Sequence, residues 1–141
     1  MFARTANAEG SIAVSAERVC PMSSTRPTAR IARTYRFEAA HYLPLLPATH
    51  KCHRLHGHNY RVMITVVGEL DERGFVADFA ELDAEVEQLI AIVDHKLLND
   101  IQGLENPTAE LIAFWFIERL PGCQTVRVYE NDDSWGEVVR D

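Results

Sequence analysis

Four of the six histidines and one of the three cysteines of this chain lie in a single stretch, HKCHRLHGHNY, residues 50–60. His56 and His58 flank Gly57 at the entrance to an alternating apolar segment, and in a strand side chains two residues apart share a face. Both imidazoles can therefore reach one metal ion. His41, which ends the preceding alternating segment, supplies a third nitrogen if the two segments pair. Three neutral imidazoles suit zinc and leave a fourth position for water or substrate, as in catalytic zinc sites.

The pattern also allows other interpretations of these histidines. They can be surface residues of a polar loop or packed residues bonded to the backbone, and three-histidine sites also hold iron, nickel or cobalt. A structural zinc site is disfavoured because such sites usually contain several cysteines. His50 and His53 have no spacing that links them to the HGH pair, and we interpret them as loop residues.

Cys52 lies four residues before His56. A thiolate near a divalent cation and imidazoles can serve as a base or a nucleophile. The alternative is a small buried apolar residue, against which the polar neighbours Lys51 and Arg54 argue. We expect that alternative for Cys20 and Cys123. An odd number of cysteines without paired spacing disfavours a disulfide framework, which favours a reducing, cytoplasmic setting.

Three further residues carry acid–base or binding chemistry. Asp94 directly precedes His95, and a carboxylate beside an imidazole can fix its tautomer for proton transfer, although adjacent side chains often diverge. Glu130 ends the segment TVRVYE on the same face as Val126 and Val128. A carboxylate at that position can bind a guanidine-like ring edge by two hydrogen bonds, or it is simply a solvated strand end.

The elements that must position these residues follow from periodicity. We predict strands at 31–41, 58–70, 124–130 and 135–139, a short extended segment at 74–79, and a loop at 42–57. One helix begins at the cap Asp78 and a second at Asn106-Pro107, and residues 94–106 form a connection. The order ββααββ predicts an α+β fold: a four-stranded antiparallel sheet with two helices on one face. The apolar faces consist of Tyr60, Val62, Ile64 and Val66 in the second strand, Phe79, Leu82, Val86, Leu89, Ile90 and Val93 in the first helix, and Leu111, Ile112, Trp115 and Leu120 in the second.

Composition divides the chain into two parts. We expect residues 1–30 to be a poorly ordered tail, with a later start at Met22 or a transit peptide as alternatives, and residues 31–141 to form one domain. The net charge is −7; residues 1–36 hold six Arg and two Glu, or +4, which leaves −11 for the remainder. An acidic body argues against nucleic acid as a partner. No apolar run approaches the length of a membrane span.

Several segments, in order over about residues 33–139, resemble the 6-pyruvoyl-tetrahydropterin synthase family, and most closely its bacterial 6-carboxytetrahydropterin synthase branch. The combination of an FxAAH segment with CxxxHGHNY and DHxxLN is specific to that family, and the CxxxHGH spacing is typical of the carboxy branch. The matching segments are FEAAHYLP (37–44), HKCHRLHGHNYRV (50–62), GFVADFAEL (74–82), VDHKLLND (93–100), GLENPTAE (103–110) and VRVYE (126–130).

The resemblance implies roles for individual residues. His41, His56 and His58 match the zinc ligands, Cys52 the proton-abstracting cysteine, and Asp94 with His95 the proton relay. Glu130 matches the carboxylate that anchors the pterin and joins the relay. Thr108 and Glu110 match positions that line the pterin pocket, and we add Lys51, Arg54 and Lys96 as candidates for contacts with a triphosphate.

The resemblance also implies a reaction and an assembly. The expected enzyme is a zinc-dependent lyase that converts 7,8-dihydroneopterin triphosphate to 6-carboxytetrahydropterin, with release of acetaldehyde and triphosphate, in queuosine biosynthesis. The expected fold is the tunnelling fold, whose subunits join their sheets into a barrel, usually as a homohexamer of two trimers with active sites between subunits.

One segment departs from the family pattern. Bacterial members often read ETCTAG after the anchoring glutamate, whereas this chain has ENDDSWGEV at 130–138. The departure leaves alternatives: a 6-pyruvoyl-tetrahydropterin synthase, a related enzyme that accepts a dephosphorylated pterin, or a zinc-binding homologue without catalysis. The presence of Cys52, Asp94 and His95 argues against the last of these, because a scaffold needs none of them.

Overall fold

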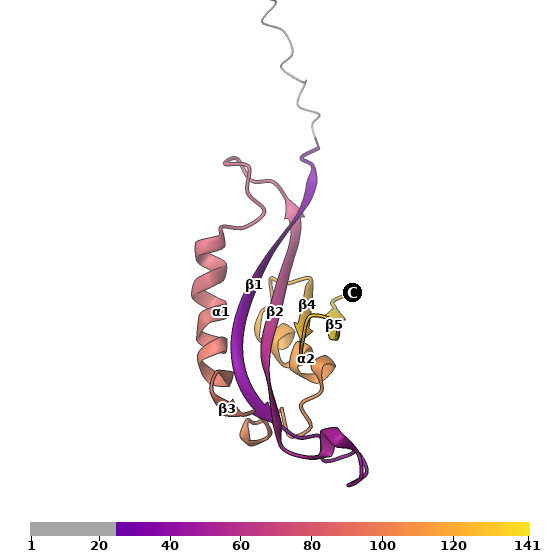
Figure 1. Cartoon of the computed structure of the whole chain (residues 1–141). Helices are drawn as coiled ribbons and strands as arrows, with labels where there is room; N and C mark the ends of the chain where they lie inside the picture. Colours follow the sequence, from indigo (N-terminus) through magenta and orange to yellow (C-terminus); the bar gives the residue numbers. More distant parts are fainter. Residues whose placement is uncertain (1–24) are drawn as a thin grey trace, which may run out of the picture.

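The computed structural model describes residues 25–141 (Figure 1). The expectations for Met22, for Cys20 and for most of the predicted tail therefore lie outside the described residues. The first strand, β1, runs over Thr28–His41, so the ordered domain begins earlier than the predicted boundary at Ile31. Its antiparallel partner β2 covers His56–Glu69, and the connection between them holds a short 3₁₀ turn, η1, at Lys51–His53.

The sheet has five strands in the order β3-β1-β2-β4-β5. Strands β4 (Thr125–Tyr129) and β5 (Trp135–Val139) continue the antiparallel sheet beyond β2. The prediction of four strands was wrong by one, because β3 (Lys96–Leu97) pairs in parallel with β1 inside the predicted connection. A strand of two residues has no periodicity that a sequence pattern could reveal.

Two helices join the halves of the sheet. Helix α1 covers Phe79–Val93, and its predicted cap Asp78 accepts a hydrogen bond from the Ala80 amide. Helix α2 covers Ala109–Arg119, and its cap is Thr108 rather than the predicted Asn106. A second 3₁₀ turn, η2 (Leu98–Asp100), follows β3. The predicted extended segment at 74–79 is also wrong: Gly74 has φ 87° in a turn that Asp71 closes, and residues 74–78 contain no strand.

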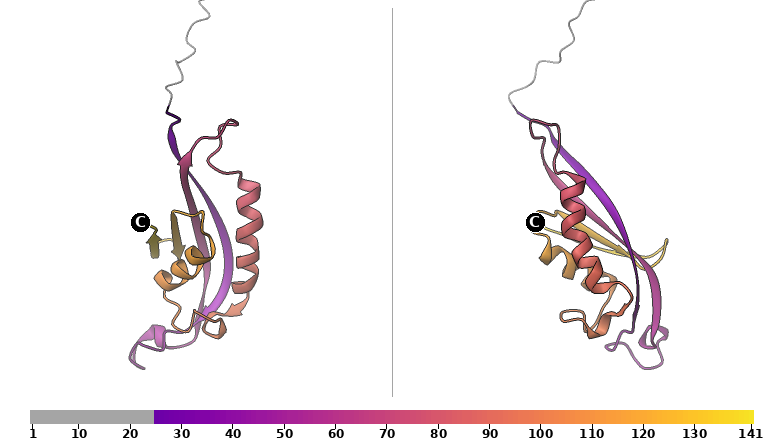
Figure 2. Two further views of the ribbon diagram at one scale, coloured as in Figure 1. Left: turned by 180° about the vertical axis from the view of Figure 1, so that it is seen from behind. Right: turned by 90° about the vertical axis from the view of Figure 1, so that its left-hand side faces the viewer.

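Both helices cover the same face of the sheet, as predicted, and share one core with it (Figure 2). Phe37 of β1 stacks on Tyr60 of β2, with ring centroids 4.8 Å apart, and Phe116 of α2 packs beside Phe37. Val62 and Ile64 continue this buried face along β2. Because the strand pattern alternates, the residues between them point to the opposite, open face of the sheet.

Candidate functional site

Three histidines meet on the covered face of the sheet where β1 ends and β2 begins. The strand register places His41 directly opposite His56, while His58 lies opposite Ala39. The Nε2 atoms of His41 and His56 are 3.0 Å apart, and one ring nitrogen from each histidine lies within 4.8 Å of the others. The structure therefore brings together His56 and His58, which the HGH spacing singled out, and His41, which we expected from the end of the preceding strand.

The hydrogen bonds of these rings determine which nitrogens are available. Nδ1–H of His41 donates to the Pro107 carbonyl at 2.9 Å, and Nδ1–H of His56 donates to the Arg54 carbonyl at 2.7 Å. A carbonyl only accepts, so each of these rings carries its proton on Nδ1 and directs the Nε2 lone pair at the other. Nε2 of His58 is buried and has no hydrogen-bond partner.

This donor set fits a metal ion. Two lone pairs at 3.0 Å and an orphaned third nitrogen repel one another unless a cation lies between them. Nitrogen ligands at about 2.0–2.1 Å from a tetrahedral ion are separated by roughly 3.3 Å, close to the spacing observed here. Backbone carbonyls on the remaining ring nitrogens of His41 and His56 are the outer partners that metal-bound histidines usually have.

Burial keeps two of the imidazoles in the neutral form that a ligand requires. The His41 side chain is 1% exposed, and its burial lowers the pKa to about 4 against the opposing hydrogen bond to Pro107. The pKa of His58 is also lowered, mainly by burial, while the nearby Glu130 carboxylate acts in the opposite direction. Both rings are therefore uncharged at neutral pH, each with one ring nitrogen free of a proton, and need not lose a proton to bind a metal.

Gly57 allows β1 and β2 to approach closely at this point. A Cβ on residue 57 would lie 3.0 Å from the Ala39 carbonyl oxygen of β1. The glycine of the HGH segment therefore has a structural reason besides leaving room between the two imidazoles.

Cys52 lies in η1, just before β2, and its thiol is free and half-buried. Its backbone is held from both sides: its amide donates to Nδ1 of His50 at 3.1 Å, and its carbonyl accepts from the Leu43 amide at 2.8 Å. His53 donates from Nδ1 to the Leu46 carbonyl at 2.9 Å. His50 and His53 are loop residues, as expected, but His50 also orders the turn that carries Cys52, a role that the spacing did not reveal. Cys123, by contrast, is a buried core residue.

Asp94 and His95 do meet, although neighbouring side chains often diverge. His95 has φ 56°, a left-handed conformation that is rare outside glycine, and this turn brings its Nδ1 within 2.9 Å of Asp94 Oδ1. Asp94 Oδ1 also accepts a hydrogen bond from the Glu38 amide. That bond is the main reason that the pKa of Asp94 is lowered, with His95 a smaller contribution.

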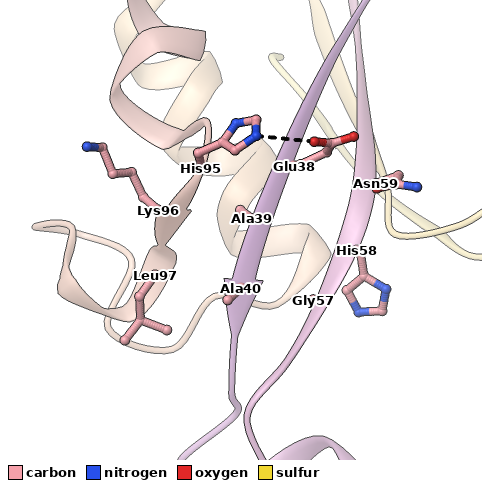
Figure 3. A pocket seen from close by; sticks show the side chains of 9 residues that line it. All are labelled: Glu38, Ala39, Ala40, Gly57, His58, Asn59, His95, Lys96 and Leu97. Atoms are coloured by element: carbon pink, nitrogen blue, oxygen red, sulfur yellow. Dashed lines mark ion pairs between the residues drawn. The ribbon is translucent and has the colours of Figure 1, made fainter.

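The structure adds one residue to this pair that we did not predict. The Glu38 carboxylate lies 3.4 Å from Nε2 of His95, so that the ring lies between two carboxylates. In Figure 3 these two side chains face each other, and the ring of His58 points away from them. Glu38 belongs to the open face of β1, because Phe37, Ala39 and His41 occupy the covered face. Within one chain, His95 and the three histidines therefore lie on different faces of the sheet.

The predicted pterin-binding residues lie together. Thr108, Glu110 and Glu130 line one cavity of about 250 Å³ at the first turn of α2, next to Trp135. Gly136 makes this arrangement possible, since a Cβ there would lie 2.9 Å from the Glu110 amide nitrogen. The Thr108 hydroxyl is already engaged, because it accepts a hydrogen bond from the Leu111 amide.

Glu130 also connects that cavity to the histidines. It lines a second depression, of about 440 Å³, together with His58 and Asp132. Asp132, which belongs to the segment that departs from the family pattern, forms an ion pair with Arg61 at 3.1 Å. That guanidinium lies over the Tyr129 ring, 4.4 Å from its centroid.

The three cations proposed as phosphate contacts are exposed. Lys51 and Arg54 flank Cys52 on and just after η1. Lys96 begins β3 beside His95 and lines a shallow depression of about 770 Å³ with Glu38 (Figure 3). Among the described residues none of the three cations forms an ion pair, so their charges are available to an anion.

Comparisons with known proteins agree with this geometry. The family model described as 6-pyruvoyl tetrahydropterin synthase matches residues 30–141. A 6-carboxy-5,6,7,8-tetrahydropterin synthase of Synechocystis is 40% identical over 115 residues, covering 74% of this chain and 88% of that protein. A dihydroneopterin monophosphate aldolase of Pyrococcus furiosus is 37% identical over 92 residues, covering 65% of this chain and 75% of that protein. The structure of Caenorhabditis elegans 6-pyruvoyl tetrahydropterin synthase superposes with a TM-score of 0.76 at 27% identity, covering 83% of this chain and 99% of that one.

None of the helices formed by residues 25–141 is long and apolar enough to cross a membrane.

Proposed function

The chain belongs to the 6-pyruvoyl tetrahydropterin synthase family, and from this premise we propose that it is a 6-carboxytetrahydropterin synthase. The reaction is the zinc-dependent conversion of 7,8-dihydroneopterin triphosphate to 6-carboxy-5,6,7,8-tetrahydropterin, with release of acetaldehyde and triphosphate, in queuosine biosynthesis. The observation that carries the proposal is the convergence of His41, His56 and His58, with one orphaned ring nitrogen, in a chain whose relatives include 6-carboxytetrahydropterin synthases.

The metal is proposed to be zinc, held by His41, His56 and His58. Three neutral imidazoles suit that ion and leave a coordination position open. When bound, it supplies Lewis acidity that polarises substrate oxygens and acidifies the adjacent C–H bond. Carbonyl groups on Nδ1 of His41 and His56 hold those two rings in the ligand tautomer, so the protein carries the site ready formed.

Different residues of the chain carry out the two proposed proton transfers. The Cys52 thiolate takes the proton from the substrate carbon, and the bonds of its backbone to His50 and Leu43 order the turn that carries it. His95 exchanges a proton through Nε2, since Asp94 engages its Nδ1. The Glu130 carboxylate accepts two hydrogen bonds from the guanidine-like edge of the pterin, and Thr108 and Glu110 line the same cavity.

Lys51, Arg54 and Lys96 are proposed to bind the triphosphate. Their charges provide the local positive field that an anionic substrate requires in a chain with a net charge of −7. Within residues 25–141 no carboxylate forms an ion pair with these three side chains, so none there has to be displaced before phosphate binds.

The active site is proposed to form between subunits of a homohexamer. The metal ligands lie on the covered face at the end of β1 and the start of β2, whereas His95 contacts Glu38 of the open face of the same sheet. A complete set of catalytic groups therefore requires a second chain, as in a barrel of joined sheets. The open backbone edges of β3 and β5, at the two ends of the strand order, are the surfaces that joining would use.

A substrate with fewer phosphates is the second candidate. The relative described as a dihydroneopterin monophosphate aldolase favours it. So do Asp132, which lines one depression with Glu130, and Asp133, which follows it in the sequence. Negative charge at that edge of the pocket opposes a highly charged phosphate chain more than a single phosphate.

Product analysis distinguishes these functions. Purified protein loaded with zinc is incubated with the triphosphate or the monophosphate of dihydroneopterin, and the pterins and aldehydes are identified by mass spectrometry. The proposal predicts acetaldehyde and 6-carboxytetrahydropterin from the triphosphate, with turnover lost in Cys52→Ala. A pyruvoyl product, or cleavage of the monophosphate alone, would assign one of the other activities. Full turnover in Cys52→Ala would refute the role of the thiol.

A further inference from the structure

The contacts of Glu38 with the Asp94–His95 pair are too numerous to result from a chance surface approach. The Glu38 amide donates to Asp94 Oδ1 at 3.0 Å, and its carbonyl accepts from the His95 amide at 2.6 Å. These two backbone bonds hold the end of α1 against β1 and set where the Glu38 side chain lies. Its carboxylate then reaches Nε2 of His95 at 3.4 Å.

The two nitrogens of His95 have different surroundings. Nδ1 is 2.9 Å from Asp94, whose side chain is 39% exposed and bonded to the backbone of β1. Nε2 is the nitrogen free to exchange a proton, and it faces Glu38, whose side chain is 61% exposed. Asp94 therefore orients the ring through Nδ1. Glu38, which is exposed to solvent, faces the exchanging nitrogen (Figure 3).

The backbone of His95 indicates that this arrangement is maintained at a cost. A non-glycine residue at φ 56° is strained, and such strain persists only where the surrounding contacts determine the conformation. Here the contacts are those with Asp94 and Glu38. A relaxed backbone at His95 would move the ring away from both carboxylates. The left-handed conformation therefore holds the imidazole between Asp94 and Glu38.

We propose that Glu38 exchanges protons with His95 and so returns the ring to its starting state after each turnover. When product leaves, the N–H bond at Nε2 breaks and an O–H bond forms at Oε2 of Glu38; that proton then passes to water. A proton required by the ring follows the same path in reverse, so both groups end each cycle unchanged. This inference rests on the proposed role of His95 in the reaction.

Replacement of Glu38 by glutamine tests the inference, because glutamine keeps the shape and the backbone bonds but cannot carry the proton. We expect Glu38→Gln to lower kcat by about tenfold or more with little change in KM. Raising the concentration of a small buffer such as formate or imidazole should restore kcat, since the side chain is exposed and a soluble acid–base pair can reach Nε2. Wild-type kcat should not depend on buffer concentration.

Matched variants separate the possible failures. Glu87→Gln makes the same charge change on the exposed surface of α1 and should leave kcat at its wild-type value. If Glu38→Gln turns over normally, or turns over slowly without buffer rescue, Glu38 is only a structural contact and the inference is wrong. His95→Gln distinguishes this from a failure of the proposed function. Inactive His95→Gln beside fully active Glu38→Gln refutes the inference alone, whereas fully active His95→Gln refutes the role of His95 and the inference with it.

Discussion

The buried imidazole of His41 makes the stability of the metal-free protein depend on pH in a predictable way. In the folded chain its pKa is about 4, whereas an unfolded chain has a histidine pKa near 6.5. Between these values the unfolded chain binds a proton that the folded chain does not bind. The free energy of unfolding therefore falls as the pH drops through this window.

The size of the effect follows from the two pKa values. Each unit of difference corresponds to about 1.4 kcal/mol, so the full contribution is roughly 3 kcal/mol once both states are protonated. Lowering the pH from 7.5 to 5.5 should remove about 1 kcal/mol through this residue, and about 2 to 3 kcal/mol should be lost by pH 4.5. His41→Asn should lack the effect, because asparagine keeps an N–H donor for the Pro107 carbonyl but does not titrate.

Urea unfolding of chelator-treated protein, followed by circular dichroism at pH 7.5, 5.5 and 4.5, measures this difference. Carboxylates also titrate in this range, and comparison of wild type with His41→Asn removes their contribution. The predicted result is that the wild type loses about 1 kcal/mol more stability than His41→Asn between pH 7.5 and pH 5.5. Parallel pH profiles for the two proteins would refute the argument that His41 is held neutral by burial.

Three further predictions test other parts of the site. Gly136→Ala should lower the free energy of unfolding by about 1–3 kcal/mol in thermal or urea unfolding, because the new Cβ meets the backbone of α2. Gly122→Ala is the control, since a Cβ there meets nothing within 4 Å. Equal effects of the two substitutions would contradict the close approach of Gly136 to α2. His50→Asn should preserve the wild-type rate of Cys52 alkylation by iodoacetamide, measured by peptide mass spectrometry, whereas His50→Gln should change that rate. Only asparagine places an acceptor where His50 Nδ1 accepts from the Cys52 amide. Identical rates in the two variants would refute the role of this hydrogen bond. His95→Gly should be more stable than His95→Ala by about 1 kcal/mol in urea unfolding, because only glycine accepts φ 56° without strain. Equal stability of the two variants would contradict that backbone conformation.

Alternation and spacing predicted the parts of the site that depend on regular strands. His56 and His58 share a face because they are two residues apart, and His41 joins them because β1 and β2 pair with His41 opposite His56. The pairing and its register are tertiary contacts that the prediction assumed, and β2 begins at His56 rather than at the predicted His58. The shared helix face of the sheet follows from the same periodicity.

The remaining features depend on tertiary contacts that no local pattern contains. β3 forms because a left-handed turn at His95 redirects the chain along β1, and a non-glycine residue carries no signal for that conformation. Glu38 lies three residues before His41 in a strand where the alternation predicts only an exposed side chain, and its contact with His95 joins residues far apart in sequence. The cap of α2 moved from Asn106 to Thr108 because the carbonyl of the intervening proline bonds to His41.

The metal content of the purified protein tests the central claim most directly. Elemental analysis by mass spectrometry should find one zinc ion for each chain of the wild type. It should find little or none in His58→Ala, which removes the nitrogen that the structure leaves buried without a hydrogen-bond partner. A wild-type protein without bound metal, or a His58→Ala variant that retains the full amount, would contradict the proposal that His41, His56 and His58 form the catalytic metal centre.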